Sequence, residues 1–503
     1  MSVALRYHEA TKYRPETIGE HPPLDWSRQP LPYKPYHGWR AVELAPLLPL
    51  DPNPFTGEAA RPMEGWRGCT LAALARWLYA TYGITGIIQQ PGQPLYLRAA
   101  PSAGALYPTE LYVAVRSWPE LPAGLYGFDP LRHRLALLRE DPGCADAVTA
   151  AAYGNAELAA APLIVIVASV FERSRWRYRE RAYRRVLLDA GHVIGNAGIA
   201  AAACGLRVAA TAAFCDEQVE AAIGCPVGEE GVLALLAVQA VDGGRQRPAW
   251  TALPSPPREG EPTLAGLHHA SALPAERPRL LGSDADELPL ADSHGWASGP
   301  RLLGEGSSGP NPLALDPLRT IIRRRSCRRF VRASLARDAL ARILAATYVP
   351  ERVGCDEQPA FARQSLATFI VVADVPGVSP GVYYLCPATL ELRPVARREP
   401  REQVRFLCLG QDLGGDAAVT VFHTADLQRC VHRYGDRAYR YLHLDAGILG
   451  QRLNLAAVAE DAGASGIGGF FDDQAADLLG IPRSQAIVYI TVLGVPAGST
   501  IVI

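Results

Sequence analysis

The stretch WRYRERAYRRVLLDAG, residues 176–191, returns later in the chain as HRYGDRAYRYLHLDAG, residues 432–447. Ten of these sixteen positions are identical, and no gap is needed to align them. Two unrelated amphipathic helices would share a few residues through their common apolar spacing, but not ten. The chain therefore contains an internal repeat, which decides how the rest of the sequence is divided.

Other segments recur in the same order around this pair. The helical pattern at 74–82 returns at 340–348, and GLYGFDP at 124–130 is matched by GVYYLCP at 381–387. Both heptapeptides lie next to short strand-like runs, which predicts a β-hairpin in each copy. A repeat of about 180 residues is too long for a solenoid unit, so each copy is expected to own a hydrophobic core.

Composition divides the chain into four parts. Residues 1–59 are rich in proline, tyrosine and charge and predict an extended arm, and residues 243–312 predict a Pro/Gly-rich linker that is at most partly ordered against the surface. Residues 60–242 and 313–503 are the two predicted domains. We predict an α+β fold class in which each domain is a mixed, mostly antiparallel sheet flanked by helices, with the two domains packed as a pseudo-dimer within one chain.

The overall composition excludes several classes of function. The formal net charge of −1 over 503 residues gives no electrostatic basis for binding nucleic acid or an anionic membrane. The ten cysteines form no CxxC pair and the histidines no HExxH motif, so we expect neither a disulfide scaffold nor a metal site. Residues 1–13 have no apolar signal core and no apolar run is long enough to span a bilayer, which predicts a cytoplasmic protein.

A loop of small residues between two prolines, PSAGALYP at 101–108, runs into the predicted strand TELYV at 109–113. Ser102 and Gly104 would let the backbone come close to a flat or charged ligand. Local composition alone favours an ordinary turn before a strand, and the rest of the chain is what supports a binding loop.

The second copy opens with the basic segment RRRSCRRF at 323–330, at the end of a predicted helix. Guanidinium groups with a hydroxyl among them suit a phosphate, because arginine donates paired, charge-assisted hydrogen bonds. The alternative is a solvated basic patch.

Taken together, these motifs resemble two fused copies of the FMN-dependent nitroreductase fold. More narrowly they are similar to the SagB-type dehydrogenases, which include azoline oxidases of peptide natural-product pathways. The resemblance rests on PSAGALYPTELYV, on GLYGFDP, on the repeated helix and, outside the two domains, on YHEATK at 7–12. It is specific for fold and cofactor class and less so for substrate.

The resemblance implies an FMN at the interface of the two domains. The basic element that meets the flavin phosphate and the N1–O2 edge would be Arg324, Arg325, Ser326 and Arg328. The glycine turn beside N5 would be Gly468 and Gly469. The loop that packs against the flavin from the other domain would be Pro101, Ser102, Ala103 and Gly104.

The two copies have lost complementary parts of this site. Counting from the paired helices, EAARP at 58–62 stands in the first copy where the second has Arg324 to Arg328, and Thr211-Ala-Ala-Phe replaces the glycine turn. Counting from the hairpins, QPAFARQS at 358–365 stands where the first copy has the loop at 101–108. One interface site would therefore keep every part and the other none, which predicts a single FMN per chain.

The family's azoline oxidases use a Lys-Tyr pair at the start of the long helix, and the matching residues here are Arg177 with Tyr178 and Arg433 with Tyr434. Arginine is a poor general base, so the tyrosine would accept or relay the proton. The chain holds only two lysines, Lys12 and Lys34, so a change to arginine is also expected from composition. We favour Tyr178 over Tyr434, and helix-cap packing is the structural alternative for both.

Three functions remain open on the sequence. The first is FMN-dependent dehydrogenation of an azoline or related bond in a peptide-derived natural product, with a peptide or small-molecule substrate and a biosynthetic partner protein. The second is NAD(P)H-dependent reduction of a nitro compound or quinone, although no GxGxxG dinucleotide motif follows a strand. The third is a flavin-free pseudoenzyme that acts as a docking scaffold.

Overall fold

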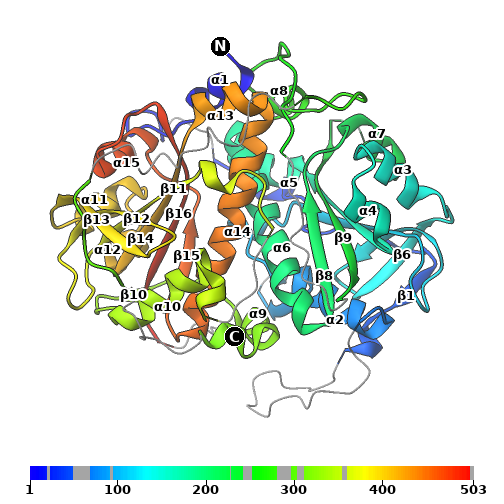
Figure 1. Cartoon of the computed structure of the whole chain (residues 1–503), viewed down its shortest axis with the longest axis horizontal. Helices are drawn as coiled ribbons and strands as arrows, with labels where there is room; N and C mark the ends of the chain where they lie inside the picture. The colour runs from blue at the N-terminus through cyan, green and yellow to red at the C-terminus, as the bar shows by residue number, and fades with distance from the viewer. Residues whose placement is uncertain are drawn as a thin grey trace.

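Two antiparallel-sheet lobes lie on either side of a central pair of long helices, α6 (Ala182–Ala203) and α14 (Ala438–Ala459) (Figure 1). The computed structural model describes residues 1–19, 23–48, 68–90, 94–226, 228–241, 252–279, 296–302, 311–353 and 359–498. The first lobe comes from the first copy of the repeat and the second lobe from the second copy. The fold is α+β with two tandem domains, as the sequence predicts.

The two long helices touch at their repeated glycines. A Cβ atom on Gly191 would lie 2.3 Å from the carbonyl oxygen of Leu444, and one on Gly447 would lie 2.3 Å from that of Leu188. Real Cβ atoms do not come this close, so only glycine allows this crossing. The contact is reciprocal, as in a two-fold homodimer, although both helices belong to one chain.

The first lobe holds a seven-stranded sheet in which every neighbouring pair is antiparallel. Its strand order is β1 (Ala41–Glu43), β6 (Arg134–Arg139), β5 (Gly124–Asp129), β4 (Thr109–Val115), β7 (Leu163–Val170), β9 (Glu230–Ala240) and β8 (Leu206–Thr211). Its helices are α2 (Leu71–Tyr82), α3 (Cys144–Ala151), α4 (Ala156–Ala160), α5 (Phe171–Tyr178) and α7 (Asp216–Ile223), with a separate hairpin of β2 (Ile84–Ile88) and β3 (Leu95–Arg98).

The second lobe repeats this design. Its order is β10 (Phe330–Val331), β16 (Gln485–Pro496), β14 (Val419–Asp426), β11 (Ala367–Val372), β12 (Gly381–Cys386) and β13 (Glu391–Arg397), with β15 (Gly463–Ile467) also paired to β16. Its helices are α9 (Pro317–Arg323), α10 (Arg337–Tyr348), α11 (Arg401–Leu407), α12 (Asp412–Asp416), α13 (Leu427–Tyr434) and α15 (Asp472–Leu479). The predicted helix pair and both predicted hairpins are confirmed.

The central strand β7 shows how the sheet is buried. Leu163, Val165 and Val167 belong to the main core under α6, while Ile164 and Ile166 belong to a second core under α3 and α7. A strand with both faces covered has no polar alternation, which explains its continuous apolar sequence. Within the described residues one stretch, Phe171–Ala203, is long and apolar enough to cross a membrane, but 83% of its most apolar window is buried inside the protein.

The predicted linker is more ordered than we expected. Its residues 252–279 include α8 (Leu264–Ala270), and Leu253, Leu264 and Leu267 are almost fully buried. The expectation of order only against the surface is therefore wrong for 252–279. Its composition gave no sign of this, because burial here depends on the partner surface and not on local pattern. The positions of the domain boundaries stay predictions.

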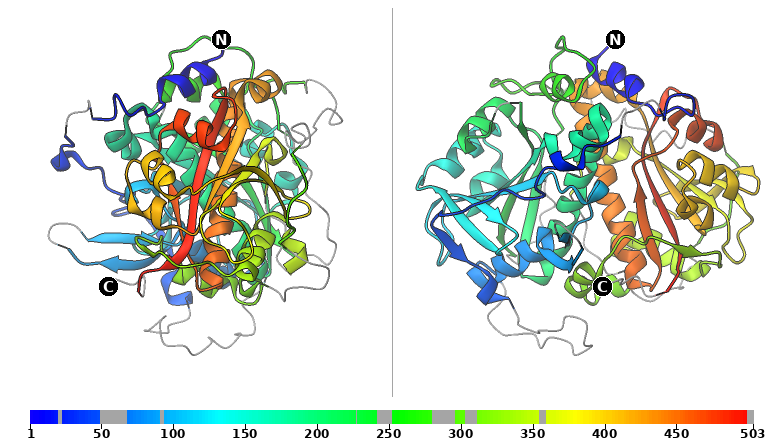
Figure 2. Two further views of the ribbon diagram at one scale, coloured as in Figure 1. Left: turned by 90° about the vertical axis from the view of Figure 1, so that its left-hand side faces the viewer. Right: turned by 180° about the vertical axis from the view of Figure 1, so that it is seen from behind.

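Helix α8 is the counterpart of the N-terminal helix α1 (Val3–Ala10), and the two lie side by side at one end of the molecule (Figure 2). His8 of α1 contacts the Tyr439 hydroxyl at 3.3 Å, and His268 of α8 contacts the Tyr183 hydroxyl at 3.0 Å. Tyr439 and Tyr183 occupy equivalent positions in α14 and α6. Each copy of the repeat thus carries an arm that docks on the other lobe, and the first arm also supplies β1 to its own sheet.

Candidate functional site

The loop that follows β3 is held in place by an aspartate from α6. The Ser102 hydroxyl donates to Asp189 Oδ2 at 2.6 Å, the Ala103 N–H donates to Oδ1 at 3.2 Å, and the Tyr107 N–H donates to Ser102 Oγ at 2.9 Å. Burial raises the pKa of Asp189 to about 7, against the lowering effect of its two donors. The Ser102 side chain is therefore used to shape the loop.

Gly104 is the exposed tip of this loop, with a left-handed φ of 66°. A Cβ atom there would lie 2.7 Å from the Tyr178 hydroxyl, so glycine is required both by the backbone and by the space. The loop and the predicted catalytic tyrosine are therefore direct neighbours.

The glycine turn of the second lobe lies opposite, between β15 and α15. A Cβ atom on Gly468 would lie 3.3 Å from Nε of Arg185, and the Arg185 guanidinium lies 3.9 Å from the centre of the Tyr178 ring. Arg185 of α6 therefore connects the first-lobe tyrosine with the second-lobe turn. Sequence reasoning missed Arg185, although it is one of the positions where the two repeated helices differ, since α14 has Tyr441 there.

The basic segment after α9 crosses to the first lobe. Arg324 is buried and donates from Nε to the carbonyl of Ala99 at 2.9 Å and from Nη2 to that of Arg98 at 3.1 Å, directly before the loop. Arg325 donates to the carbonyl of Thr85 at 2.7 Å. Burial lowers the pKa of Arg324 to about 10, so it stays charged at neutral pH. Both side chains donate hydrogen bonds from the second lobe to the first, and Arg325 also donates to the carbonyls of Ile322 and Arg324 in its own segment.

Ser326 and Arg328 make few side-chain polar contacts with the described residues. Ser326 is half-buried with its hydroxyl 3.4 Å from Nη1 of Arg324, while the exposed side chain of Arg328 makes no hydrogen bond or ion pair within the described part of the chain. The N–H of Cys327 donates to the carbonyl of Ala464 in β15 at 2.8 Å. The other end of β15 leads into Gly468 and Gly469, so strand β15 connects the basic segment with the glycine turn.

The two predicted catalytic tyrosines differ in access. Tyr178 is half-buried, and burial raises its pKa against the opposing effect of Arg185 and Arg177. Tyr434 is 3% exposed, and its carbonyl accepts a hydrogen bond from the N–H of Ser255 at 3.0 Å. The preference for Tyr178 agrees with this difference, and the role itself stays a prediction.

The second lobe also has a loop whose backbone is held by an aspartate. This loop is shifted by two residues from the alignment of QPAFARQS with the loop at 101–108 that the sequence predicts. The N–H groups of Phe361 and Ala362 donate to Asp445 at 2.9 and 2.6 Å. In the first loop the hydroxyl of Ser102 and the N–H of Ala103 donate to Asp189. The expectation that QPAFARQS had lost the loop is therefore wrong for its backbone, although the Pro-Ser-Ala-Gly residues are absent. Counting from the hairpin failed because the connections before β4 and β11 differ in length.

The second-lobe loop borders the position that corresponds, in the repeat, to the one beside the loop at 101–104. Protein side chains fill this second position. The Phe361 ring stacks on Tyr441 with 6.4 Å between centroids, and the Tyr441 hydroxyl donates to the carbonyl of Leu253 at 2.9 Å. Ala212 and Ala213, the counterparts of Gly468 and Gly469, are buried with Leu253. EAARP at 58–62 lies outside the described residues.

A buried row of hydrogen-bonded side chains lies beside the position formed by the loop at 101–104 and the turn at Gly468 and Gly469. Tyr489 Oη and His192 Nε2 are 2.9 Å apart, and His192 Nδ1 and Gln451 Oε1 are 2.8 Å apart. A Cβ atom on Gly466 would lie 1.9 Å from Tyr489 Oη, so this hydroxyl reaches β15 just before the glycine turn. The equivalent of His192 in α14 is Ile448, so comparison of the two copies does not reveal these hydrogen-bonded side chains.

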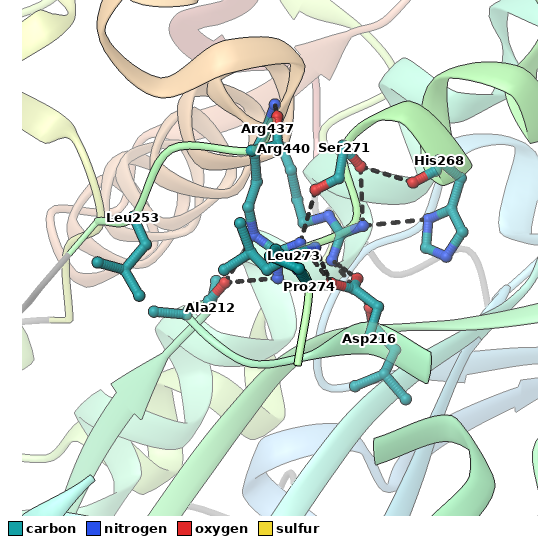
Figure 3. Close-up of polar contacts among 12 residues, drawn as sticks. Ala212, Asp216, Leu253, His268, Ser271, Leu273, Pro274, Arg437 and Arg440 are labelled. Atoms are coloured by element: carbon teal, nitrogen blue, oxygen red, sulfur yellow. Dashed lines mark hydrogen bonds and ion pairs between the residues drawn. The ribbon is translucent and has the colours of Figure 1, made fainter. Parts of the chain in front are cut away.

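Two buried ion-pair triads, each made of two arginines and one aspartate, join the lobes. One triad lies near each of the two positions. Arg437 and Arg440 each donate to one oxygen of Asp216 at 2.6 Å (Figure 3). Arg181 and Arg184 contact Asp472 in the same way at 2.7 Å. Asp472 directly follows the glycine turn, so its triad positions that turn against α6.

The comparisons with known proteins agree with this architecture. The model of the Nitroreductase family matches residues 70–240 and 321–495. A solved Anabaena variabilis structure named as a nitroreductase is 37% identical, covers 99% of this chain and 100% of its own, and has a TM-score of 0.84.

Two curated relatives are shorter matches. A Methanocaldococcus jannaschii protein named as a nitroreductase is 34% identical over 151 residues, which is 30% of this chain and 72% of that protein. The trifolitoxin-processing protein TfxB of Rhizobium leguminosarum bv. trifolii is 32% identical over 130 residues, which is 25% of this chain and 35% of TfxB. The family match covers more than half of the chain and both halves of the fold. The chain belongs to the nitroreductase family and carries two of its domains in tandem.

Proposed function

We propose that the protein is an FMN-dependent oxidoreductase with one flavin per chain, between the loop at 101–104 and the turn at Gly468 and Gly469. The observation that carries this proposal is the asymmetry of the two pseudo-equivalent positions. At one of them Gly104, Gly468 and Gly469 are partly exposed, whereas at the other Phe361, Ala212 and Ala213 are buried.

The residues present fit FMN. Gly104, Gly468 and Gly469 bring partly exposed backbone without side chains to this position, and Tyr178, Arg185 and Leu409 pack where their Cβ atoms would lie. Ser326 and Arg328 would hold the phosphate, because a hydroxyl and an exposed guanidinium are its usual donors. Arg324 would stabilise the phosphate end of the site through its hydrogen bonds to the carbonyls of Ala99 and Arg98. We assign Arg325 to the contact with Thr85 and not to the phosphate.

Bound FMN would supply hydride transfer at N5. The chain's own residues would handle the proton and the position of the substrate. Tyr178 is protonated at neutral pH, since burial raises its pKa above the usual value. Its hydroxyl beside Gly104 would therefore act as a relay that takes the proton lost by the substrate while it passes its own proton to solvent. Arg185, stacked on the Tyr178 ring, favours any negative charge that forms on this hydroxyl.

The substrate class that we propose is an azoline or related bond in a peptide-derived natural product. Support comes from the similarity to TfxB, whose name describes the processing of trifolitoxin. A peptide substrate would come with a biosynthetic partner protein.

Anaerobic mixing distinguishes this reaction from its alternatives. We expect a thiazoline-containing peptide to bleach the flavin absorbance at least tenfold faster than NADH does, because the substrate would be the hydride donor. Faster bleaching by NADH would favour a nitro or quinone reductase. A colourless protein that takes up no added FMN would favour the docking scaffold.

A further inference from the structure

An exposed arginine at the edge of the proposed site lies close to two aromatic rings. The Arg177 guanidinium lies 5.6 Å from the centre of the Tyr178 ring and 5.9 Å from the Trp26 ring. Its Nη1 atom would be 3.4 Å from a Cβ atom on Gly104, the tip of the loop at 101–104. Arg177 is thus placed by the loop, by its own helix and by the N-terminal arm.

The donors of Arg177 have no protein acceptor. This side chain is exposed and makes no hydrogen bond or ion pair within the described residues. The neighbouring carboxylate of Asp25 accepts from the N–H and the hydroxyl of Ser27 instead, at 3.0 and 2.6 Å. A guanidinium flanked by rings keeps its edge donors in a fixed plane, which is the geometry that binds a carboxylate through two hydrogen bonds.

An apolar surface is fixed next to this cation. Trp26 is 61% exposed, yet its ring packs edge-on against Trp176 at 5.4 Å, and the Trp176 Nε1–H donates to the carbonyl of Asp25 at 3.1 Å. A large aromatic side chain held in place while exposed is typical of a contact surface for a ligand.

The second copy differs at the described counterparts of Arg177, Tyr178 and Trp176. Arg433 also lies over its neighbouring tyrosine, at 5.3 Å, but Tyr434 is buried and His432 replaces Trp176. At these described positions the exposed arrangement lies beside the position that we assign to the flavin and not at its counterpart, so packing of the repeated helix alone does not explain it.

We propose that Arg177, Trp26 and Trp176 form an anion subsite that binds a carboxylate of the substrate peptide, with an adjacent apolar group resting on Trp26. The carboxylate is either the C-terminus of the peptide or an acidic side chain close to the reacting ring. This inference rests on the proposed function for the identity of the ligand as a peptide. Arg177 then selects the substrate by charge and takes no part as a base.

Calorimetry on the flavin-loaded protein tests this subsite with three short N-acetylated thiazoline peptides. One ends in a free carboxylate, one is its carboxamide, and one is a carboxamide with aspartate as its last residue. We expect at least one of the two acidic peptides to bind about tenfold or more tightly than the carboxamide, in line with one charge-assisted bidentate contact. The acidic peptide that gains affinity identifies the source of the carboxylate.

Variants at two neighbouring arginines complete the test. Arg177→Gln should abolish the preference for the acidic peptide, and Arg177→Lys should restore part of it. The matched control, Arg179→Gln, removes another exposed arginine nearby and should keep the full preference. Equal affinities of the three peptides for the wild-type protein would overturn the subsite, and so would an equal loss of preference in both glutamine variants. It would also be overturned if Arg177→Gln changed only the discrimination between NADPH and NADH.

The same samples separate this inference from the function. If the acidic peptide binds through Arg177 but no peptide bleaches the flavin, the dehydrogenase proposal fails and the subsite stands. If the peptides bleach the flavin but bind without charge preference, the subsite fails alone.

Discussion

Tyr178→Phe is expected to slow anaerobic flavin reduction by the substrate by about 10²–10⁴-fold, the usual contribution of a positioned acid or base. The hydroxyl lies beside Gly104, where it would relay to solvent the proton that the substrate loses. Removing the oxygen leaves the ring under Arg185, so the flavin content and the thermal midpoint should stay close to wild type. Stopped-flow absorbance at saturating substrate measures the effect.

Tyr434→Phe is the matched control, since it makes the same change at the equivalent position of the second copy. Tyr434 is 3% exposed and lies under the segment of Ser255, so flavin reduction in this variant should match the wild-type rate. A Tyr178→Phe protein that keeps more than a tenth of the rate, or equal losses in both variants, would remove Tyr178 from the reaction.

Asp216→Asn should lower the free energy of unfolding by about 3–5 kcal/mol, the cost of leaving a buried ion pair without its partner. Here two guanidinium groups, Arg437 and Arg440, would lose their shared carboxylate in a region with almost no solvent exposure (Figure 3). Urea unfolding at pH 7 measures the change. The exposed pair of Asp477 with Arg483 provides a control, because Asp477→Asn should cost less than about 1 kcal/mol.

The same variant has a defined pH dependence. Burial raises the pKa of Asp216, but Arg437 and Arg440 outweigh it and bring the pKa down to about 2, below the unfolded value of about 3.9. The carboxylate therefore stabilises the fold above about pH 5, and this contribution is lost as the pH falls from about 4 to 2. The difference in stability between wild type and Asp216→Asn should shrink over that interval. A difference that stays constant down to pH 2 would contradict the ion-pair explanation.

The fold was largely predictable from the sequence because each domain obeys local rules. The repeated helix, the two hairpins and the strand-to-helix glycine turn all depend on residue spacing and on glycine, which are visible along the chain. The reciprocal contact of Gly191 and Gly447 gives a physical reason for the identity of the LDAG segments, since the glycine makes the crossing and the aspartate holds the loop.

The partners of the arginines were not predictable in the same way. Arg324 and Arg325 belong to a motif that suits phosphate, yet their donors meet carbonyl groups of the other lobe, and only the packing of the lobes decides this. The segment at 252–279 was missed because its likeness to the N-terminal arm is confined to a few positions, such as His268 for His8. Arg185 acts from a position where the repeats differ, so similarity between the copies could not reveal it.

The most direct test of a single flavin site is the ratio of FMN to protein in the purified, FMN-saturated chain, from absorbance and amino-acid analysis. We predict a ratio near one, falling below about 0.1 in a Ser326→Ala, Arg328→Gln double variant after desalting, and unchanged in the neighbouring exposed control Arg329→Gln. This double variant spares Arg324 and Arg325, whose loss would also weaken contacts between the lobes. A wild-type ratio near two or near zero, or a double variant that stays fully yellow, would contradict the account.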